Sequence, residues 1–406
     1  MRGVSIITIG DELLIGQVVD TNSAFMAAML RENGFTLNRR VAIGDEKNAI
    51  IHALDEELKI SDAVIFTGGL GPTSDDITKD VLNEYFGAKL ILNERALATI
   101  HEIFNLKKRP ITERNIMQAM LPDVCEPIYN DNGTAPGMLF RKDGKMIFSL
   151  PGVPSEMMAM MNDVIAKLKF NFQTKELHMK TLITFGIGES FIADKLVDFE
   201  AEISGKLSLA YLPNYSLVRL RLSGEDESFL EEKFSALAKI LEEHIIALKD
   251  VTVPSLIFEL LQSQNKTVAI VESCTGGNIA HQLTLIPGAS QVFAGGIVSY
   301  TNSVKHELLG VDIETLKLHT AVSEQVCAEM LQGVLSRITA DYAIAITGYV
   351  GLEGNGNIPG GTVFIATGTA SSHIVKKYSL RNSRAKNIEV ATTLAFLQLR
   401  QNIVSQ

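Results

Sequence analysis

Cysteine is scarce in this chain, and the few that occur are far apart. Cys125, Cys274 and Cys327 are odd in number and lack zinc-ligand spacing, so the sequence offers neither a disulfide framework nor a cysteine-based metal site. This usage is typical of a reducing compartment, and we expect a cytoplasmic location. Proline is also scarce, with 11 residues, and the hydrophobic fraction of 46% excludes a disordered or collagen-like chain.

Long apolar runs and an excess of basic residues are missing as well. The first apolar run, residues 4–9, is followed at once by Asp11 and Glu12, which makes it too short for the hydrophobic part of a signal peptide. No run approaches the roughly 18 apolar residues of a membrane-spanning helix. The net charge is −10, so nothing electrostatic draws the whole molecule to nucleic acid or anionic lipid. We expect neither export nor membrane insertion.

The 406 residues are too many for one hydrophobic core, because single cores stop growing near roughly 250–300 residues. Residues 1–170 and 251–406 alternate short apolar runs with helical periodicity, which predicts a mostly parallel sheet covered by helices. Between them, residues 171–250 form a smaller segment in which Val218, Leu220 and Leu222 alternate with arginines, as in a half-exposed strand. The predicted fold is multidomain α/β with a small α+β connector.

A glycine-rich loop follows a buried strand in the first domain. The strand covers residues 62–69, and the loop 68–76 leads into a helix. Glycines let backbone amides converge on an anion such as phosphate, and ligands of open α/β sheets bind at the carboxyl ends of strands. Asp75 and Asp76 would repel a phosphate unless a divalent metal joined them to its oxygens. The alternative is that one of these carboxylates only caps the following helix.

Four segments of the first domain, residues 7–22, 66–78, 131–138 and 149–157, resemble the amino-terminal domain of the CinA family, which is similar to molybdopterin-binding domains. The resemblance implies cleavage of the ADP-ribose pyrophosphate with Mg, Mn or Co held at Asp75 and Asp76. The residues that it places around the nucleotide are Asp11, Glu12, Asn22, Thr67, Gly68, Gly69, Gly71, Thr73, Asn132, Gly133, Thr134, Pro151, Gly152 and Glu156.

The middle segment resembles the K-homology (KH) unit of the same family. KH domains bind nucleic acid through a Gly-x-x-Gly loop on a positive surface, whereas this acidic segment has only Gly186-Ile187-Gly188 nearby. We therefore expect a spacer or dimer-forming module and no nucleic-acid binding. The resemblance implies a homodimer.

In the last domain, the turn 272–277 joins a predicted strand to a helix. Ser273 would be exposed at a helix N-terminus, where the dipole favours an anion, and amides of the turn could hold a developing oxyanion. A hydroxyl needs a base to become a nucleophile, and Lys305 is the candidate if burial lowers its pKa. The alternatives are that Ser273 or Thr275 is a simple N-cap and that Lys305 is solvated.

Cys274 is a rival nucleophile. A thiol at a helix N-terminus can have a lowered pKa, and His281 or His306 could serve as its base.

Segments 272–277, 300–305 and 346–348 resemble the carboxy-terminal CinA domain, the nicotinamide mononucleotide deamidase family, over roughly 254–402. This implies hydrolysis of nicotinamide mononucleotide to nicotinate mononucleotide and ammonia through an acyl-enzyme, without a cofactor. Ser273 would be the nucleophile and Lys305 its base. By matched position, Tyr300 and Thr347 join the catalytic group, and the substrate-binding residues are Thr275, Gly276, Gly277, Gly348 and Arg384.

The loop 349–361 departs from the family's pattern, an Ala-Gly-Pro loop followed by Gly-Gly. Here Glu353 adds a negative charge where an anionic nucleotide is expected, which bears on the identity of the substrate. The competing function is a non-catalytic nucleotide sensor, associated with competence, that keeps both pockets.

Overall fold

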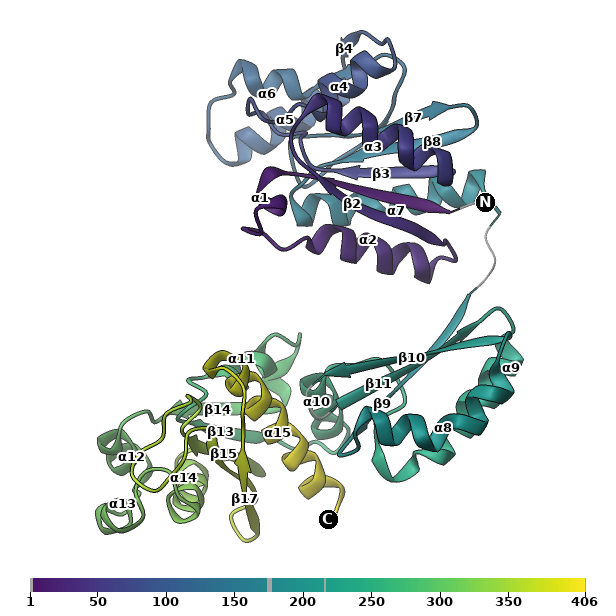
Figure 1. The fold of residues 1–406 in the computed structure, drawn as a ribbon. Coiled ribbons are helices and arrows are strands. Elements are labelled where there is room, and N and C mark those ends of the chain that lie inside the picture. The colour runs from purple at the N-terminus through teal and green to yellow at the C-terminus, as the bar shows by residue number, and fades with distance from the viewer. Residues whose placement is uncertain (1–2, 174–176, 215–216, 406) are drawn as a thin grey trace. The chain divides into compact units, whose positions relative to one another are not determined.

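The computed structural model describes residues 3–173, 177–214 and 217–405. The chain forms two compact units, and Figure 1 shows the helices and strands of each. The first unit holds Met1–Met179, Gly205–Ser208 and Ser223–Glu231. The second holds Lys180–Ser204, Leu209–Leu222 and Glu232–Gln406. The architecture is mixed α/β, which confirms the predicted fold class.

The first unit is built on a sheet of strand order β2-β1-β3-β8-β7-β6. The four strands β2, β1, β3 and β8 are parallel, and β7 and β6 run antiparallel at one edge. A separate antiparallel pair joins β4 to β5. The bounds are β1 Val4–Ile9, β2 Leu37–Ile43, β3 Ala63–Thr67, β4 Leu90–Leu92, β5 Met120–Pro122, β6 Glu126–Ile128, β7 Gly137–Lys142 and β8 Lys145–Leu150.

Helices cover both faces of this sheet because its central strands are apolar on both sides. Ile6 of β1 packs with Met26 of α2 and Met161 of α7, whereas the next residue, Ile7, packs with Leu54 of α3 on the other face. Figure 1 shows α2 and α3 on opposite sides of the strands. The bounds are α1 Asp11–Leu14, α2 Thr21–Glu32, α3 Lys47–Ile60, α4 Thr78–Tyr85, α5 Glu94–Leu106, α6 Glu113–Gln118 and α7 Pro154–Asn171.

The middle segment has a sheet of order β10-β11-β9-β12 with two helices. Ile183 of β9 and Ile246 of β12 belong to the same apolar core as Ile257 of α10, so this part of the connector and the last domain pack as one body. The bounds are β9 His178–Phe185, α8 Glu189–Ile203, β10 Leu207–Asn214, β11 Leu217–Gly224, α9 Glu227–Ile240 and β12 Ile245–Ala247.

The last domain has a sheet of order β14-β13-β15-β16-β17. The strands β14, β13 and β15 are parallel, and β16 and β17 are antiparallel. Ile270 of β13 faces the core under α10 and α15, and Val271 faces the core under α14. The bounds are α10 Val253–Ser263, β13 Val268–Glu272, α11 Asn278–Thr284, β14 Phe293–Val298, α12 Asn302–Leu309, α13 Ile313–His319, α14 Glu324–Arg337, β15 Tyr342–Gly348, β16 Thr362–Gly368, β17 His373–Ser379 and α15 Arg384–Val404.

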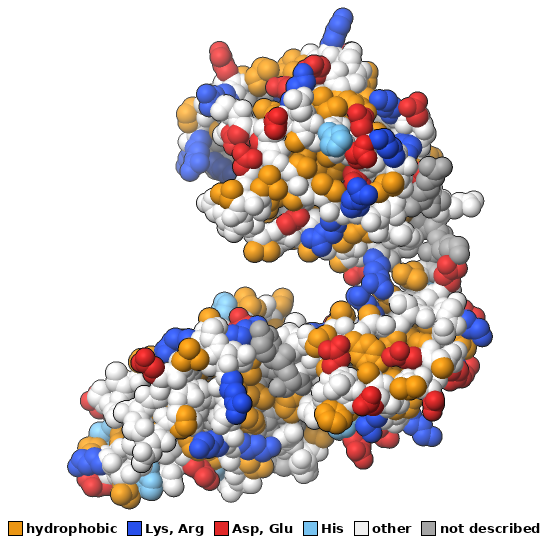
Figure 2. All heavy atoms as spheres, viewed as in Figure 1, with side chains coloured by type: hydrophobic (Ala, Val, Ile, Leu, Met, Phe, Trp, Pro, Cys, Tyr) orange, Lys and Arg blue, Asp and Glu red, His pale blue; other side chains and the backbone are white. Residues whose placement is uncertain are grey.

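The surface carries charges of both signs. Figure 2 shows Lys and Arg side chains interspersed with Asp and Glu over the displayed face. Within the described part of the chain, every helix is too short or too polar to cross a membrane.

Candidate functional site

The last domain has a cavity where its parallel strands end. The carboxyl ends of β13, β14 and β15 lie at one edge of the sheet, because parallel strands end on the same side. The cavity has a volume of about 200 Å³. Its lining consists of Ser273, Cys274, Tyr300, Lys305, Ala321, Val322, Thr347, Gly348, Tyr349, Val350, Gly351, Glu353 and Arg384.

Ser273 and Lys305 meet in this cavity. Lys305 extends from α12, and its Nζ lies 3.0 Å from Ser273 Oγ. The same Nζ donates to the carbonyl oxygens of Ser299, at 2.6 Å, and Tyr300, at 3.4 Å. The lysine is 1% exposed, and burial lowers its pKa to about 8 because a charged amine loses its hydration. Lys305 is therefore not a solvated helix lysine.

The helix after Ser273 is already capped by a carboxylate. Glu272, the last residue of β13, accepts hydrogen bonds from the amides of Gly277, at 3.1 Å, Ile279, at 3.1 Å, and Ala280, at 2.9 Å. The expectation that this helix N-terminus would receive an anionic ligand is therefore wrong, since a protein carboxylate occupies it. Ser273 is not the N-cap either, because α11 has Gly277 in that position.

Two amides of the turn remain available. The amide of Ser273 donates to the carbonyl of Ile346 in β15 at 3.0 Å. The amides of Cys274 and Thr275, by contrast, make no hydrogen bond with the described residues. The buried hydroxyl of Thr275 has no partner there either. The two donors that directly follow the serine are thus the ones that could hold an oxyanion.

Cys274 lines the cavity but has the wrong protonation state for a nucleophile. Burial raises the pKa of its thiol to about 12, so the thiol stays protonated near neutral pH, and only a thiolate is reactive. Nδ1 of His306 lies 2.8 Å from the carbonyl of Val311, and neither His281 nor His306 is among the residues that line the cavity. The geometry favours Ser273 over Cys274.

Other predicted residues form the wall of the cavity. The hydroxyl of Tyr300 accepts a hydrogen bond from the Arg384 guanidinium at 3.2 Å. Thr347 Oγ1 donates to the carbonyl of Ala321 at 2.7 Å, which fixes this side chain in place. Gly348 lines the wall, and Glu353 from the altered loop shares the cavity with Arg384.

Three predicted substrate-binding residues do not line this cavity. Thr275, Gly276 and Gly277 form the turn beneath it. Gly277 has a φ of 104°, a conformation that residues with a side chain rarely adopt, so its contribution is to the path of the backbone. These three residues follow Ser273 closely in the sequence, but they are not among the residues that line the cavity.

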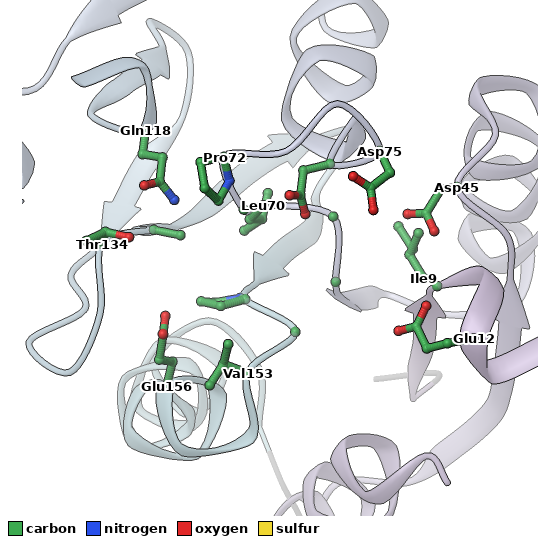
Figure 3. A pocket seen from close by; sticks show the side chains of 18 residues that line it. Ile9, Glu12, Asp45, Leu70, Pro72, Asp75, Gln118, Thr134, Val153 and Glu156 are labelled. Carbon is green, nitrogen blue, oxygen red and sulfur yellow. The ribbon is translucent and has the colours of Figure 1, made fainter. Parts of the chain in front are cut away.

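The first unit has a larger cavity, again where parallel strands end. Segments that follow β1, β2, β3 and β8 contribute to a volume of about 310 Å³. Its lining residues, drawn in Figure 3, are Ile9, Gly10, Glu12, Asp45, Gly68, Gly69, Leu70, Gly71, Pro72, Asp75, Asp76, Gln118, Thr134, Ala135, Pro151, Gly152, Val153 and Glu156. Most of the residues predicted to bind a nucleotide are among them.

One end of this cavity is strongly acidic. Figure 3 shows Glu12, Asp45 and Asp75 on the same side. The pKa of Asp45 is raised, mainly because burial disfavours its charged form, and the negative charges of Asp11, Glu12 and Asp75 add to this shift. The pKa of Asp75 is lowered instead, mainly by the polar side chain of Thr73 nearby. Such crowding of carboxylates favours a cation.

The carboxylates predicted to hold a metal do not cap the following helix. The N-cap of α4 is Ile77, without a side-chain hydrogen bond. Asp76 Oδ2 instead accepts from the amide of Thr73 at 2.9 Å and from its hydroxyl at 2.5 Å. The described residues contain no set of three or more His, Cys, Asp or Glu placed to hold a metal ion. A cation at Asp75 and Asp76 would therefore need oxygens from its ligand to complete its coordination.

A smaller cavity of about 120 Å³ adjoins the first through Ile9, Glu12 and Gly152. Asn22 and Thr67 line it. Asn22 Nδ2 donates to Thr67 Oγ1 at 3.1 Å and to the Gly152 carbonyl at 2.8 Å, and Thr67 Oγ1 donates to the Pro151 carbonyl at 2.8 Å. This network ties the loops after β3 and β8 together.

Four predicted residues line neither cavity: Asp11, Thr73, Asn132 and Gly133. Asp11 and Asp45 accept hydrogen bonds from each other's amides, at 3.3 and 3.1 Å, and Thr73 holds Asp76. A Cβ on Gly133 would lie 2.1 Å from the Glu156 carboxyl carbon. These residues support the residues that line the cavity.

Two polar lining residues of the larger cavity escaped the sequence analysis. Asp45 follows β2, and Gln118 ends α6, each in a segment without a glycine-rich motif. The signal for Asp45 is its place directly after a strand parallel to β1, at the edge where ligands bind. For Gln118 the sequence holds no comparable signal, because α6 leads into β5, which pairs with β4 in a separate sheet and not with the main sheet of the unit.

Three family models match the chain. They are described as a probable molybdopterin binding domain over residues 5–169, a damage-inducible protein CinA KH domain over 179–247, and a CinA C-terminal domain over 250–403. Among relatives, a CinA-like protein of Flavobacterium psychrophilum is 40% identical over 410 residues, covering 98% of each chain. A CinA-like protein of Cytophaga hutchinsonii is 38% identical over 402 residues, covering 97% of this chain and 96% of its own.

A solved structure of a CinA protein of unknown function from Thermoplasma acidophilum is also similar. It is 36% identical, covers 42% of this chain and 98% of its own, and has a TM-score of 0.38.

Proposed function

Because this chain belongs to the CinA family, with a molybdopterin-binding-like domain at its start, we propose that it is a hydrolase of pyridine-nucleotide salvage. Its last domain removes the amide nitrogen of nicotinamide mononucleotide, giving nicotinate mononucleotide and ammonia. The observation that carries this proposal is the contact of 3.0 Å between Lys305 Nζ and Ser273 Oγ inside a cavity.

The environment of Lys305 suits a general base. A neutral amine has two N–H bonds and one lone pair, and the carbonyls of Ser299 and Tyr300 accept those two hydrogens. The lone pair then faces the hydroxyl of Ser273. With a pKa of about 8, roughly a tenth of the amine is neutral at pH 7, so a base is available without a histidine.

In the first step, Ser273 Oγ attacks the carboxamide carbon while Lys305 Nζ takes the hydroxyl proton. The oxyanion that forms is held by the amide of Cys274, which belongs to a lining residue and makes no hydrogen bond with the described residues. The carbon–nitrogen bond then breaks, and the Lys305 ammonium gives its proton to the leaving nitrogen, which departs as ammonia.

In the second step, water attacks the acyl ester and gives a proton to Lys305. The ester carbon–oxygen bond breaks, and Ser273 regains its proton from the lysine. Arg384, whose guanidinium is held by Tyr300 at 3.2 Å, binds the phosphate of the nucleotide because a planar guanidinium pairs with phosphate oxygens.

The experiment is ammonia release from nicotinamide mononucleotide by the wild type, Ser273→Ala and Cys274→Ala. We expect Ser273→Ala to lose at least about 10³-fold in kcat, since loss of a nucleophile has effects of this size or larger, and Cys274→Ala to stay within about 3-fold of the wild type. Loss of activity in Cys274→Ala alone would overturn the assignment of Ser273.

A second activity is favoured by the acidic cavity of the first unit. We propose that this domain hydrolyses the pyrophosphate of ADP-ribose with Mg²⁺, Mn²⁺ or Co²⁺. Asp75 and Asp76 would hold the metal, and the carboxylates of Glu12 and Asp45, which line the same cavity, support a site built for a cation. A bound divalent metal neutralises phosphate charge and activates water. Gly68 has no room for a side chain, since a Cβ there would lie 2.2 Å from the Ile9 carbonyl oxygen, and glycines at 68, 69 and 71 leave the backbone of this loop open to a phosphate.

The test is release of AMP and ribose 5-phosphate from ADP-ribose with each metal. We expect Asp75→Asn and Asp76→Asn to lose at least about 100-fold in kcat/KM. Asp143→Asn, at an exposed position away from the cavity, is the matched control. Metal-independent hydrolysis would contradict the proposal.

The non-catalytic sensor is the other outcome of these assays. If neither nucleotide is hydrolysed and each still raises the Tm, then binding without turnover is the function, because a ligand that binds only the folded state stabilises it.

A further inference from the structure

The larger cavity of the first unit contains a buried carboxamide without a partner. Gln118 is 5% exposed and lines the cavity. Its Oε1 is buried without a hydrogen-bond partner, and its side chain makes no hydrogen bond with the described residues. An unsatisfied buried carbonyl destabilises a folded protein. A group retained in this state points to a ligand that supplies its partner.

The cavity is chemically divided, and Gln118 lies away from its acidic part. Figure 3 shows Gln118, Pro72, Thr134 and Glu156 on one side and Glu12, Asp45 and Asp75 on the other. Glu156 accepts a hydrogen bond from Asn130 Nδ2 at 2.7 Å. Pro72 lies beside Gln118, and Leu70 and Ala135 also line the cavity. Apolar lining residues together with a carboxamide that has both a donor and an acceptor suit the face and edge of a flat heterocycle better than they suit a phosphate.

The backbone around Gln118 is held in place. Gln118 is the last residue of α6, whose first turn is closed by a capping box between Thr112 and Asn115. The Met117 carbonyl accepts a hydrogen bond from Lys79 at 2.6 Å, and β5 begins at Met120, two residues after Gln118. The backbone of Gln118 is thus anchored before any ligand arrives, which lowers the entropic cost of recognition.

We propose that Gln118 recognises the base of the nucleotide in this cavity, at the end opposite Glu12, Asp45 and Asp75. A carboxamide pairs with an edge that has an amino group beside a ring nitrogen, donating to the nitrogen and accepting from the amino group. Adenine has such an edge. This inference rests on the proposed ADP-ribose activity, in which the pyrophosphate lies at the acidic end and the adenine lies against Gln118.

The test uses binding of AMP and of ribose 5-phosphate, which has the phosphate and sugar without the base. The variants are Gln118→Leu and Gln118→Met, two apolar replacements of similar size, so that one serves if the other fails to fold. Gln17→Leu, at an exposed position of the same unit, is the control. We expect both Gln118 variants to weaken AMP binding about 10-fold, as for loss of a bidentate base contact, and to leave the Kd for ribose 5-phosphate unchanged.

The unliganded variants give a second readout. Removing a buried acceptor that has no partner should leave the Tm of Gln118→Leu equal to or above that of the wild type, which a purely structural role of Gln118 would not produce. Equal weakening of both ligands, unchanged AMP binding, or a wild type that does not bind AMP overturns the inference. If the Gln118 variants weaken AMP binding as expected but the wild type does not hydrolyse ADP-ribose, only the proposed pyrophosphatase activity is overturned.

Discussion

At the scale of single residues, the protonation of Lys305 decides what the last domain can do. The buried amine must be neutral to act as a base. The activity that we propose should therefore rise with pH as the amine loses its proton. The same burial makes Cys274 unreactive, because desolvation raises the pKa of an acid that becomes charged and lowers that of a base that loses its charge. Burial thus favours the neutral form of both side chains, which is the basic form of the lysine and the unreactive form of the cysteine.

The pH profile follows from this shift. Burial lowers the pKa of Lys305 from 10.5 to about 8. We therefore expect kcat/KM for nicotinamide mononucleotide to rise between pH 6 and 9, with a midpoint at about pH 8. Lys305→Arg should be inactive, because a guanidinium stays protonated. Ammonia release measured across this range is the check, and a profile that falls or stays flat would contradict the role of Lys305.

The same pKa also affects stability. The folded state disfavours the charged amine, so between about pH 8 and 10.5 the unfolded chain binds the additional proton. By linkage, the Lys305 contribution to the free energy of unfolding rises with pH in this window, so it is lost as the pH falls from 10.5 to about 8 and changes no further below that pH. Lys305→Met should lack this contribution, which urea unfolding of wild type and variant at pH 7 and 10 measures.

Glu353 is the residue through which we expect the altered loop to affect binding of the proposed substrate. It shares a cavity with Arg384, so its carboxylate opposes the binding of a phosphate. We expect Glu353→Gln to lower KM for nicotinamide mononucleotide by roughly 2- to 5-fold, the scale of one screened charge interaction. Nicotinamide riboside, which has no phosphate, is the control substrate, and an equal change in its KM would show that charge is not the cause.

At the scale of elements, the turn between β13 and α11 is organised by Glu272. Its carboxylate accepts hydrogen bonds from three amides at the start of the helix. The amides of Cys274 and Thr275 make no hydrogen bond with the described residues. Because charged acceptors at a helix N-terminus are stabilising, Glu272 fixes the turn that presents Ser273.

Replacement of Glu272 should therefore affect both stability and turnover. We expect Glu272→Gln to lower the free energy of unfolding by about 1–3 kcal/mol, since an amide NH₂ group cannot accept from the helix amides. It should also lower kcat more than it raises KM, because the oxyanion donors lose their position. Thermal unfolding and steady-state kinetics test this, with the exposed Glu307→Gln as control. A change in KM alone would contradict a role in positioning.

The sequence predicts strands, loops and motif residues better than it predicts their partners. Ser273, Lys305 and Tyr300 lie in two short motifs, and the structure brings them to one cavity. The occupation of the α11 N-terminus by Glu272 was not foreseen, because a carboxylate before a serine can turn in several directions. Asp45 and Gln118 were missed for a different reason. Each lies outside the motif segments, in a stretch without a glycine-rich turn.

At the scale of the whole molecule, the two cavities belong to units with separate hydrophobic cores. We expect thermal unfolding in two transitions, one raised by nicotinamide mononucleotide and the other by ADP-ribose with a divalent metal. A ligand at 100 times its Kd adds about 2.7 kcal/mol to the unit that binds it. Calorimetry of the full chain with each ligand is the measurement, and a single transition shifted by both ligands would contradict it.

The reactive pair depends on the alignment of two neighbouring strands. The amide of Ser299, just beyond β14, donates to the carbonyl of Glu272 at 2.7 Å. This hydrogen bond joins the start of the segment that leads to Lys305 to the residue directly before Ser273. A slip of β14 by one position would displace that segment by about 3.3 Å, more than a hydrogen bond tolerates. Shortening or lengthening the chain between Gln291 and Thr301 would therefore abolish the proposed deamidation, although Ser273 and Lys305 themselves remain unchanged.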